Sequence, residues 1–247
     1  MLNILNDRRT IRKYTEKDVS EELLNELLNA ACRASTTGTM QVYSIIETRK
    51  QEMKEKLAPC HFNQPMVKEA PVVLTFCADF NRFNRWCRQR NAEPGYDNFL
   101  SFITALIDAI IAAQTLCVAA EAKGMGICYL GTTTYMAGKI IDILELPAGV
   151  VPVTTITLGW PAEKPEQTDR LPLNAVLHKE KYCDYTEQDI DRIYAEKEAR
   201  ADSKQFVKEN NKETLAQVFT EVRYKKEDNE TFSKLLIKVL EQQGFLK

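Results

Sequence analysis

The chain has 247 residues, of which 44% are hydrophobic, and its formal net charge is −2, from 33 Lys and Arg against 35 Asp and Glu. This length and composition suit one large domain, or a domain with an extension, around a hydrophobic core, and they exclude a disordered chain. The balance of charge gives no global attraction for nucleic acid or an anionic membrane, so we expect neither as a partner.

Seven scattered cysteines without a C-x-x-C pair, several of them in apolar runs, predict buried thiols in a reducing compartment rather than a disulfide framework. The first ten residues carry Asp7, Arg8 and Arg9, where a secretory signal would need an uninterrupted apolar stretch. We therefore predict a cytoplasmic protein.

The first strongly predicted element is a helix that begins after Ser20, an N-cap residue followed by acidic residues and a helical stripe of leucines. This helix ends near Ala34, where small hydroxylated residues and a glycine break the period. Residues 42–47 predict a strand, residues 51–57 a short helix, and residues 71–77 a buried strand with a proline at its first position.

Residues 99–120 form an apolar segment that is long enough to span a bilayer. Asp108 lies in its middle, where a carboxylate costs about 2.5 to 3.5 kcal/mol on insertion scales, and no aromatic belt marks both ends. We therefore predict a helix of a soluble protein, covered on all sides by its own domain or by a partner subunit.

Residues 127–130 and 153–158 predict two further strands, so helices alternate with a few apolar strands around a central sheet covered on both faces. Charged residues dominate the later part of the chain until a final helix at residues 232–242 recovers an apolar stripe. We predict a core at residues 1–182 and a helical extension at 183–247, packed on the core or on a partner subunit.

Several kinds of active site find little support in the sequence. The two histidines, His61 and His178, lie far apart and lack neighbours at metal-ligand spacing, so we expect no metal site. A G-x-S-x-G elbow and a Walker loop are absent, and Gly124, Gly126 and Gly131 have the wrong spacing for a dinucleotide fingerprint.

Three short motifs could bind an anionic, polyhydroxylated ligand. Three guanidinium groups and a hydroxyl at residues 8–12 suit a phosphate, although alone they could form a solvated basic N-terminus. Residues 36–41 offer hydroxyls, backbone amides and a glutamine, or else form an ordinary capped turn. Residues 124–131 form a strand ending in a glycine that a ligand could approach closely, or else a plain helix-to-strand connection.

Together the motifs resemble a known family. R-R-x-I-R-x-Y at 8–14, A-S-T-T-G-T-M-Q at 34–41, N-Q-P-x-V-x-x-A-P at 63–71, G-M-G-I-C-Y-L-G at 124–131 and L-G-W-P-A-E at 158–163 occur in the order found in nitroreductases. The chain resembles that family over roughly its whole length. Residues 76–82 and 170–172 are similar to its flavin-reductase branch, which includes NADPH-dependent oxygen-insensitive nitroreductases.

The resemblance implies an α+β fold, with a central mixed β-sheet flanked by helices, in an intertwined homodimer that holds FMN at the subunit interface. It places the helix at residues 99–120 in the dimer core. It implies that the phosphate is held by Arg8, Arg9, Thr10 and Arg170, the ribityl chain or ring by Thr36, Thr37, Thr39 and Gln41, and the ring by Arg12, Gln64, Tyr129, Leu130 and Gly131.

The implied reaction moves two electrons from NADPH or NADH through FMN to a nitroaromatic, quinone or free flavin, by a ping-pong mechanism. Arg12, near N1 and O2 of the ring, would stabilise the charge of the reduced flavin, and the Gly131 N–H would lie near N5, so these two are the expected catalytic residues. The alternatives are an FMN-binding storage or sensing protein without turnover, and a family member adapted to another flavin reaction.

Two departures from the branch affect these expectations. Thr168 stands where the branch usually carries a lysine, so one cation expected at the phosphate is absent. The arginine pair expected to bind the 2′-phosphate of NADPH is also not evident, which leaves the choice between NADPH and NADH open. A basic run at residues 82–90 is interpreted as a solvated helix face.

Overall fold

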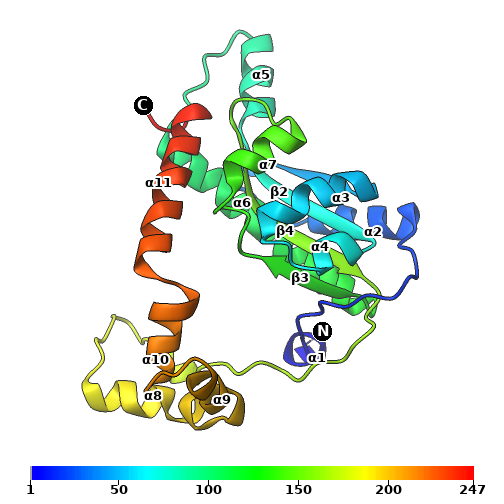
Figure 1. The fold of residues 1–247 in the computed structure, drawn as a ribbon. Coiled ribbons are helices and arrows are strands. Elements are labelled where there is room, and N and C mark those ends of the chain that lie inside the picture. Colours follow the sequence, from blue (N-terminus) through cyan, green and yellow to red (C-terminus); the bar gives the residue numbers. More distant parts are fainter. Residues whose placement is uncertain (1) are drawn as a thin grey trace. The chain divides into compact units, whose positions relative to one another are not determined.

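A computed structural model describes residues 2–247, which divide into two compact units (Figure 1). The first unit comprises residues 2–166 together with Phe232–Lys247, and the second comprises Gln167–Thr231. The chain thus leaves the first unit after Glu166 and returns to it at Phe232. The predicted boundary at 182/183 lies inside the second unit, and the last residues of the predicted extension belong to the first.

The first unit is built on a four-stranded sheet in the order β1 (Tyr43–Thr48), β2 (Val72–Asp79), β4 (Val150–Gly159) and β3 (Gly126–Leu130). Each predicted strand is confirmed, and β2 and β4 are buried throughout because both are central. The prediction of a mixed sheet is wrong for these strands, since all three pairings are antiparallel. Apolar periodicity identifies a strand but does not encode the direction of its neighbour.

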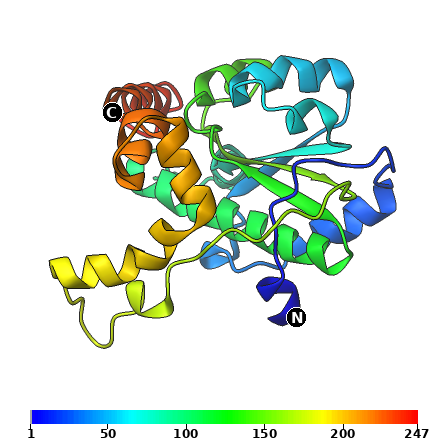
Figure 2. The same cartoon turned by 60° about the horizontal axis from the view of Figure 1, so that its bottom comes forward.

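Helices cover both faces of the sheet (Figures 1 and 2). On one face, α2 (Glu21–Ala31) and α6 (Phe99–Ala122) pack together, and α6 contacts each of the strands. On the other face lie α3 (Gln51–Leu57), the 3-10 turn η2 (Ala58–His61), α4 (Met66–Glu69) and α7 (Ala137–Leu144). The remaining elements before the second unit are α1 (Leu2–Asn6), the 3-10 turn η1 (Thr37–Thr39) and α5 (Asn81–Gln89).

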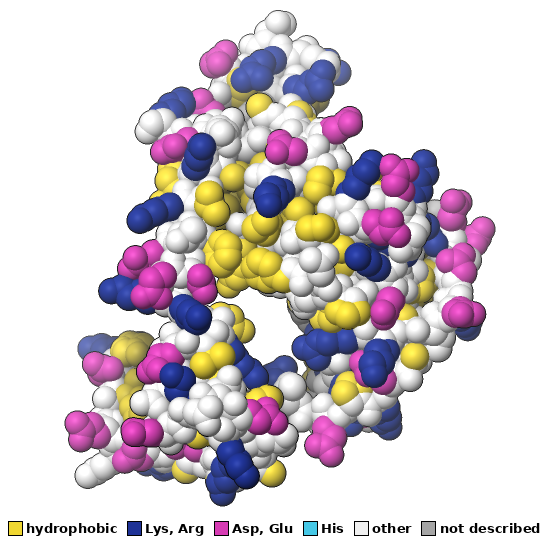
Figure 3. All heavy atoms as spheres, in the orientation of Figure 1, with side chains coloured by type: hydrophobic (Ala, Val, Ile, Leu, Met, Phe, Trp, Pro, Cys, Tyr) yellow, Lys and Arg dark blue, Asp and Glu magenta, His cyan; other side chains and the backbone are white. Residues whose placement is uncertain are grey.

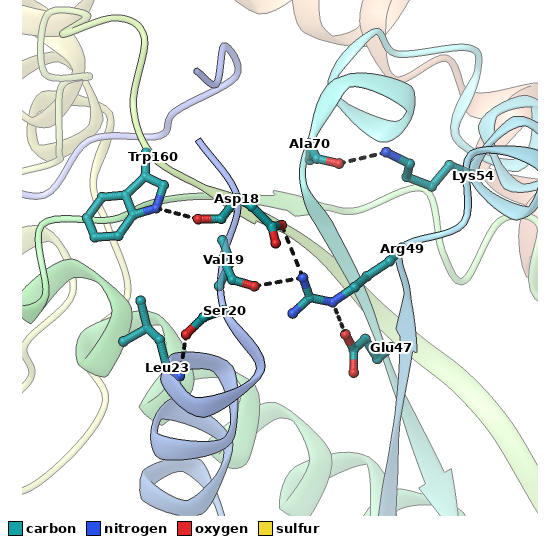
Figure 4. A network of polar contacts seen from close by, with 9 residues as sticks. All are labelled: Asp18, Val19, Ser20, Leu23, Glu47, Arg49, Lys54, Ala70 and Trp160. Carbon is teal, nitrogen blue, oxygen red and sulfur yellow. Dashed lines mark hydrogen bonds and ion pairs between the residues drawn. The ribbon is translucent and has the colours of Figure 1, made fainter. Parts of the chain in front are cut away.

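A polar network ties the start of α2 to the ends of two strands (Figure 4). The Arg49 guanidinium, just after β1, donates to the Val19 carbonyl at 2.7 Å and contacts Asp18 at 3.3 Å and Glu47. The Trp160 indole, just after β4, donates to the Asp18 carbonyl at 3.1 Å. Three segments distant in sequence are thereby held around the N-terminus of α2.

Helix α6 is long and apolar enough to cross a membrane by length and composition, but it packs as a core helix on α2 and the sheet. Its small residues face inward, and Asp108 is only 1% exposed. In the single chain one side of the helix stays uncovered. Its large apolar side chains that remain exposed are Phe99, Leu100, Ile107, Ile110 and Ile111.

The C-terminal helix α11 (Lys226–Gln242) begins in the second unit and completes the core of the first. Val239 and Leu240 are buried, and the Phe245 ring lies 5.7 Å from that of Phe102 on α6. The Gly149 N–H, before β4, donates to the Gln243 carbonyl at 3.0 Å. The final predicted helix is therefore confirmed, and its end belongs to the first unit rather than to the predicted extension.

The second unit is helical, as predicted for this part of the chain. Thr186 and Asp189 form a capping box at the start of α8, and Lys197 on that helix pairs with Asp169 at 2.7 Å. Its elements are the 3-10 turn η3 (Leu173–Ala175), α8 (Glu187–Ala199), α9 (Ala201–Glu209), α10 (Leu215–Val218), the π-turn η4 (Phe219–Arg223) and the first turn of α11.

The seven cysteines are free thiols, and five of them are buried, as predicted. Burial raises the pKa of the Cys117 thiol on α6 to about 12. A thiol in this state is protonated at neutral pH and acts as a small apolar side chain.

Candidate functional site

The N-terminal arginine segment lies along the edge strand β3. The Ile11 N–H donates to the Ile127 carbonyl at 3.0 Å, and a Cβ added to Gly126 would lie 2.6 Å from the Ile11 Cβ. The Tyr14 hydroxyl bonds with the Thr157 hydroxyl at 2.7 Å, and burial raises its pKa. Glycine at 126 therefore permits the close approach that fixes residues 8–14 beside the sheet.

Glu163 holds the same segment from its other side. One oxygen of its carboxylate accepts the backbone N–H groups of Arg12, at 2.9 Å, and of Lys13, at 3.1 Å. The backbone at Arg12 is thus fixed while its side chain remains exposed. Burial raises the pKa of the Cys128 thiol on β3. The guanidinium groups of Arg12 and Arg8 oppose that rise, since both cations lie near the strand.

Arg8 and Arg9 line a cavity of about 460 Å³. Arg8 pairs with Glu121, at the end of α6, at 3.3 Å, and burial raises the pKa of that carboxyl while Arg8 opposes the rise. Arg9 donates to the Asp7 carbonyl at 2.7 Å, and its Nε is buried without a hydrogen-bond partner among residues 2–247. The other lining residues are Asn3, Ile4, Ile11, Gly124, Met125, Pro161, Glu163 and Lys164.

Residues 36–41 form a loop anchored on the buried Asp108 carboxylate of α6. The Thr36 hydroxyl donates to this carboxylate, and Thr37 donates to it through its N–H at 2.9 Å and its hydroxyl at 3.1 Å. The Thr36 oxygen also accepts the Gln41 N–H at 3.0 Å. Both hydroxyls therefore shape the loop within one chain, and their contact with a ligand stays a prediction.

The end of this loop has an unusual backbone and is exposed. Gly38, Thr39 and Gln41 have φ values of 54°, 57° and 51°, which lie in the left-handed region. The Thr39 hydroxyl donates to the Gly38 carbonyl at 2.6 Å, and Arg82 donates to the Gln41 carbonyl. Arg82 belongs to the basic run that we interpret as a solvated helix face. Its hydrogen bond to Gln41 gives it a local structural role instead.

A buried histidine joins the turn before Gln64 to the turn after Gly131. His61 Nδ1 lies 2.8 Å from the Thr132 hydroxyl, and the His61 carbonyl accepts the Gln64 N–H at 3.1 Å. His61 is fully buried, which lowers its pKa to about 4 and keeps it neutral at pH 7. No atom lies within 4 Å of a Cβ added to Gly131, so its backbone faces open space.

Two of the predicted groups contact α6 at separate positions. The Tyr129 hydroxyl of β3 donates to Gln114 at 3.4 Å, and the loop at residues 36–41 is anchored at Asp108. Six residues separate these positions, which corresponds to about 9 Å along a helix. Leu130 is buried beside Tyr129, and Thr10 is half-buried in the arginine segment.

Arg170 belongs to the second unit, whereas the other predicted site residues belong to the first. It donates to the Thr168 hydroxyl at 2.7 Å and to the Asp169 carbonyl at 2.8 Å. Thr168, which replaces the lysine usual in the branch, therefore accepts a hydrogen bond from the neighbouring predicted phosphate ligand.

Sequence reasoning missed three residues that organise the site, namely Glu121, His61 and the anchoring role of Asp108. Asp108 had a visible signal, since a carboxylate inside an apolar helix requires buried donors. Another hollow, of about 490 Å³, contains none of the predicted site residues. It is lined by Ile46, Glu47, Thr48, Arg49, Lys50, Met53, Ile143, Leu144 and Glu145.

An antiparallel sheet between two helical layers, with an arginine segment along its edge strand, defines the class of protein. The model of the Nitroreductase family matches residues 5–160, and the chain belongs to this family. An FMN reductase (NADPH) of Bacillus subtilis is 35% identical over 181 residues, 72% of each chain. A CR(VI) reductase of Pseudomonas sp. is 32% identical over 72% of this chain and 74% of its own.

Solved structures agree with this assignment. A protein of Bacteroides fragilis NCTC 9343 is 58% identical, with a TM-score of 0.98 over 99% of this chain and 100% of its own. The NfrA1 nitroreductase of B. subtilis is 28% identical, with a TM-score of 0.86 over 99% of this chain and 98% of its own.

Proposed function

We propose that this protein is an FMN-dependent oxidoreductase that takes two electrons from NADPH or NADH and passes them to a small acceptor. The acceptor class comprises nitroaromatics, quinones and free flavins. The observation that carries the proposal is the docking of residues 8–14 along β3 through the Ile11 to Ile127 hydrogen bond of 3.0 Å, which brings Arg12 beside the strand that ends just before Gly131.

The residues present fit a flavin mononucleotide. The buried Arg9 Nε has no hydrogen-bond partner among residues 2–247, and the cavity beside it is lined by Arg8 and Lys164 as well as by the carboxyl groups of Asp7, Glu121 and Glu163. Guanidinium groups suit a phosphate, so Arg8 and Arg9 would hold it. The open space at Gly131 admits a flat ring against the backbone. Gln64, whose backbone N–H is bonded to the carbonyl of the buried His61, would supply its side-chain amide for the polar edge of that ring.

FMN, when bound, supplies a ring that accepts a hydride from the nicotinamide and returns two electrons to the acceptor. Arg12 presents a permanent cation whose backbone is held by Glu163, so its charge can stabilise the negative charge of the reduced ring. The Gly131 N–H would supply a hydrogen-bond donor for N5 of that ring. The proposed chemistry requires no side-chain nucleophile or general base.

The proposed working form is a cytoplasmic homodimer, with no membrane or nucleic-acid partner. The uncovered side of α6 supports the dimer, because Leu100 is 74% exposed and Ile107 50% exposed on the same helix face. A second copy on this side would bury the stripe. It could also bring a second loop of residues 36–41, anchored on the same helix, toward the site.

The visible spectrum of the purified protein tests the function. We expect flavin absorbance that bleaches when NADPH or NADH is added without oxygen and returns on addition of a nitroaromatic, a quinone or chromate. Separate titrations with the two nicotinamides decide the donor. Protein that stays colourless after incubation with FMN would contradict the proposal. Bound flavin that neither donor reduces would favour a storage or sensing role, and light scattering measures the dimer.

A further inference from the structure

Phe62 stands at a backbone position that glycine normally takes. It ends the 3-10 turn η2 with a φ of 55°, and Asn63 follows with a φ of 54°. Left-handed backbone is strained for a bulky residue, whereas glycine adopts it freely at the end of a helical turn. The surrounding structure maintains this strain, and a property of the side chain is needed to explain a phenylalanine here.

Burial is not that property. Phe62 is 54% exposed, although phenylalanines at a core position of this fold, such as Phe76 and Phe80, are at most 1% exposed. Its ring contacts one other aromatic ring, that of Phe232, with the centroids 6.2 Å apart and the planes inclined by 44°. Half of a large apolar ring stays available to a ligand.

Phe62, Phe232 and Tyr135 together form a surface that we call the aromatic shelf. The Tyr135 ring stacks on Phe232, with centroids 4.5 Å apart and planes within 7°. The three residues come from the turn after η2, from the start of α11 in the first unit and from the segment before α7. In the orientation of Figure 1, hydrophobic side chains gather on the first unit beside α11 (Figure 3).

Two residues of the shelf are close in sequence to residues of the candidate flavin site. Phe62 lies two residues before Gln64, and Tyr135 lies four residues after Gly131. The hydrogen bond of 2.8 Å between His61 and Thr132 ties these two turns together. The shelf is thus tied to the two turns that carry Gln64 and Gly131, two of the five residues predicted to contact the flavin ring.

We propose that the aromatic shelf, with Phe62 as its exposed face, binds planar aromatic electron acceptors by ring stacking and sets the preference of the enzyme for them. This inference rests on the proposed function and specifies the acceptor class. Aromatic rings gain attraction from offset or edge contacts beyond that of apolar area alone. Non-planar inorganic acceptors gain nothing from such a surface.

The test compares acceptors in the FMN-loaded enzyme and its variants. Phe62→Gly removes the ring and suits the backbone, so we expect the unfolding temperature to fall by no more than about 2 °C, although a lost core phenylalanine would lower it much further. We expect kcat/KM for 2-methyl-1,4-naphthoquinone to fall about tenfold, the effect of losing a good ring contact. We expect kcat/KM for chromate and ferricyanide to change less than twofold.

Three further variants separate stacking from other roles. Phe62→Leu keeps an apolar side chain without a ring and is expected to lose most of the quinone preference, while Phe62→Tyr keeps the ring and restores it. Trp86→Ala is the matched control, because Trp86 is 53% exposed on α5 but lies outside the shelf. It is expected to leave the kcat/KM ratio of quinone to chromate unchanged.

Two measurements distinguish failure of this inference from failure of the proposed function. Anaerobic flavin reduction by NADPH and NADH is measured without an acceptor. If Phe62→Gly slows this reduction as much as it slows the quinone reaction, the shelf belongs to the nicotinamide and the inference is overturned. Equilibrium dialysis with 2-methyl-1,4-naphthoquinone needs no turnover, so it applies even if no donor reduces the protein. Equal quinone binding by the parent and Phe62→Gly would also overturn it.

Discussion

The buried His61 predicts how the stability of the protein responds to acid. Burial lowers its folded pKa from 6.5 to about 4, so below pH 6.5 the unfolded chain binds a proton that the folded chain excludes. The stability due to neutral His61 is fully present above pH 6.5 and is lost as the pH falls toward 4. The difference between the two pKa values gives a loss of about 2 kcal/mol between pH 7 and pH 5.

Urea unfolding at pH 7 and pH 5, in saturating FMN, measures this loss. Carboxyl groups also titrate in this range, so the quantity to compare is the pH dependence of the parent with that of His61→Gln, which cannot titrate. We expect the parent to lose about 2 kcal/mol more than the variant over this interval. Equal pH dependences of the parent and His61→Gln would refute the reasoning.

The remaining predictions concern the site and its supports. Arg12→Ala should slow anaerobic flavin reduction about 100-fold in stopped-flow measurements without lowering expression. Arg12→Lys, which keeps the charge, should slow it less. A parental rate in the alanine variant would rule out an electronic role for Arg12. Gly131→Ala should fold normally, since its Cβ meets open space, but should weaken FMN binding in fluorescence titrations. Gly126→Ala should lower the free energy of unfolding in urea by about 1 to 3 kcal/mol, whereas Gly95→Ala should leave it almost unchanged. Asp108→Ala should lower the free energy of unfolding by about 3 kcal/mol, because one N–H and two hydroxyls lose their acceptor. A loss below about 1 kcal/mol would show that water replaces the carboxylate.

Local patterns in the sequence predict most elements of this fold. The Ser20 cap followed by a leucine stripe predicts α2, and the Ser20 hydroxyl does accept the Leu23 N–H at 3.2 Å. Runs of β-branched residues locate all four strands to within a few residues. Such signals succeed because they depend only on neighbours along the chain.

Features that depend on distant residues could not be predicted in this way. The antiparallel direction of each pairing, the partnership of Asp108 with residues 36–37 and the burial of His61 all arise from the packing of separate segments. The motif at residues 34–41 identifies the family but does not reveal that its first two threonine hydroxyls bind a carboxylate of α6. The roles of the thirteen predicted site residues in holding FMN stay predictions.

The return of the chain at Phe232 has a consequence for the synthesis of the protein. Residues 2–166 contain the whole sheet, but Leu240 and Phe245 fill positions in its core that are 3% and 1% exposed. While a ribosome is still adding the second unit, the core around Phe102 lacks these side chains and presents apolar surface to the cell. The nascent sheet therefore depends on protection from aggregation until residues 239–245 have emerged, and a stop codon anywhere in the second unit would leave that surface permanently open.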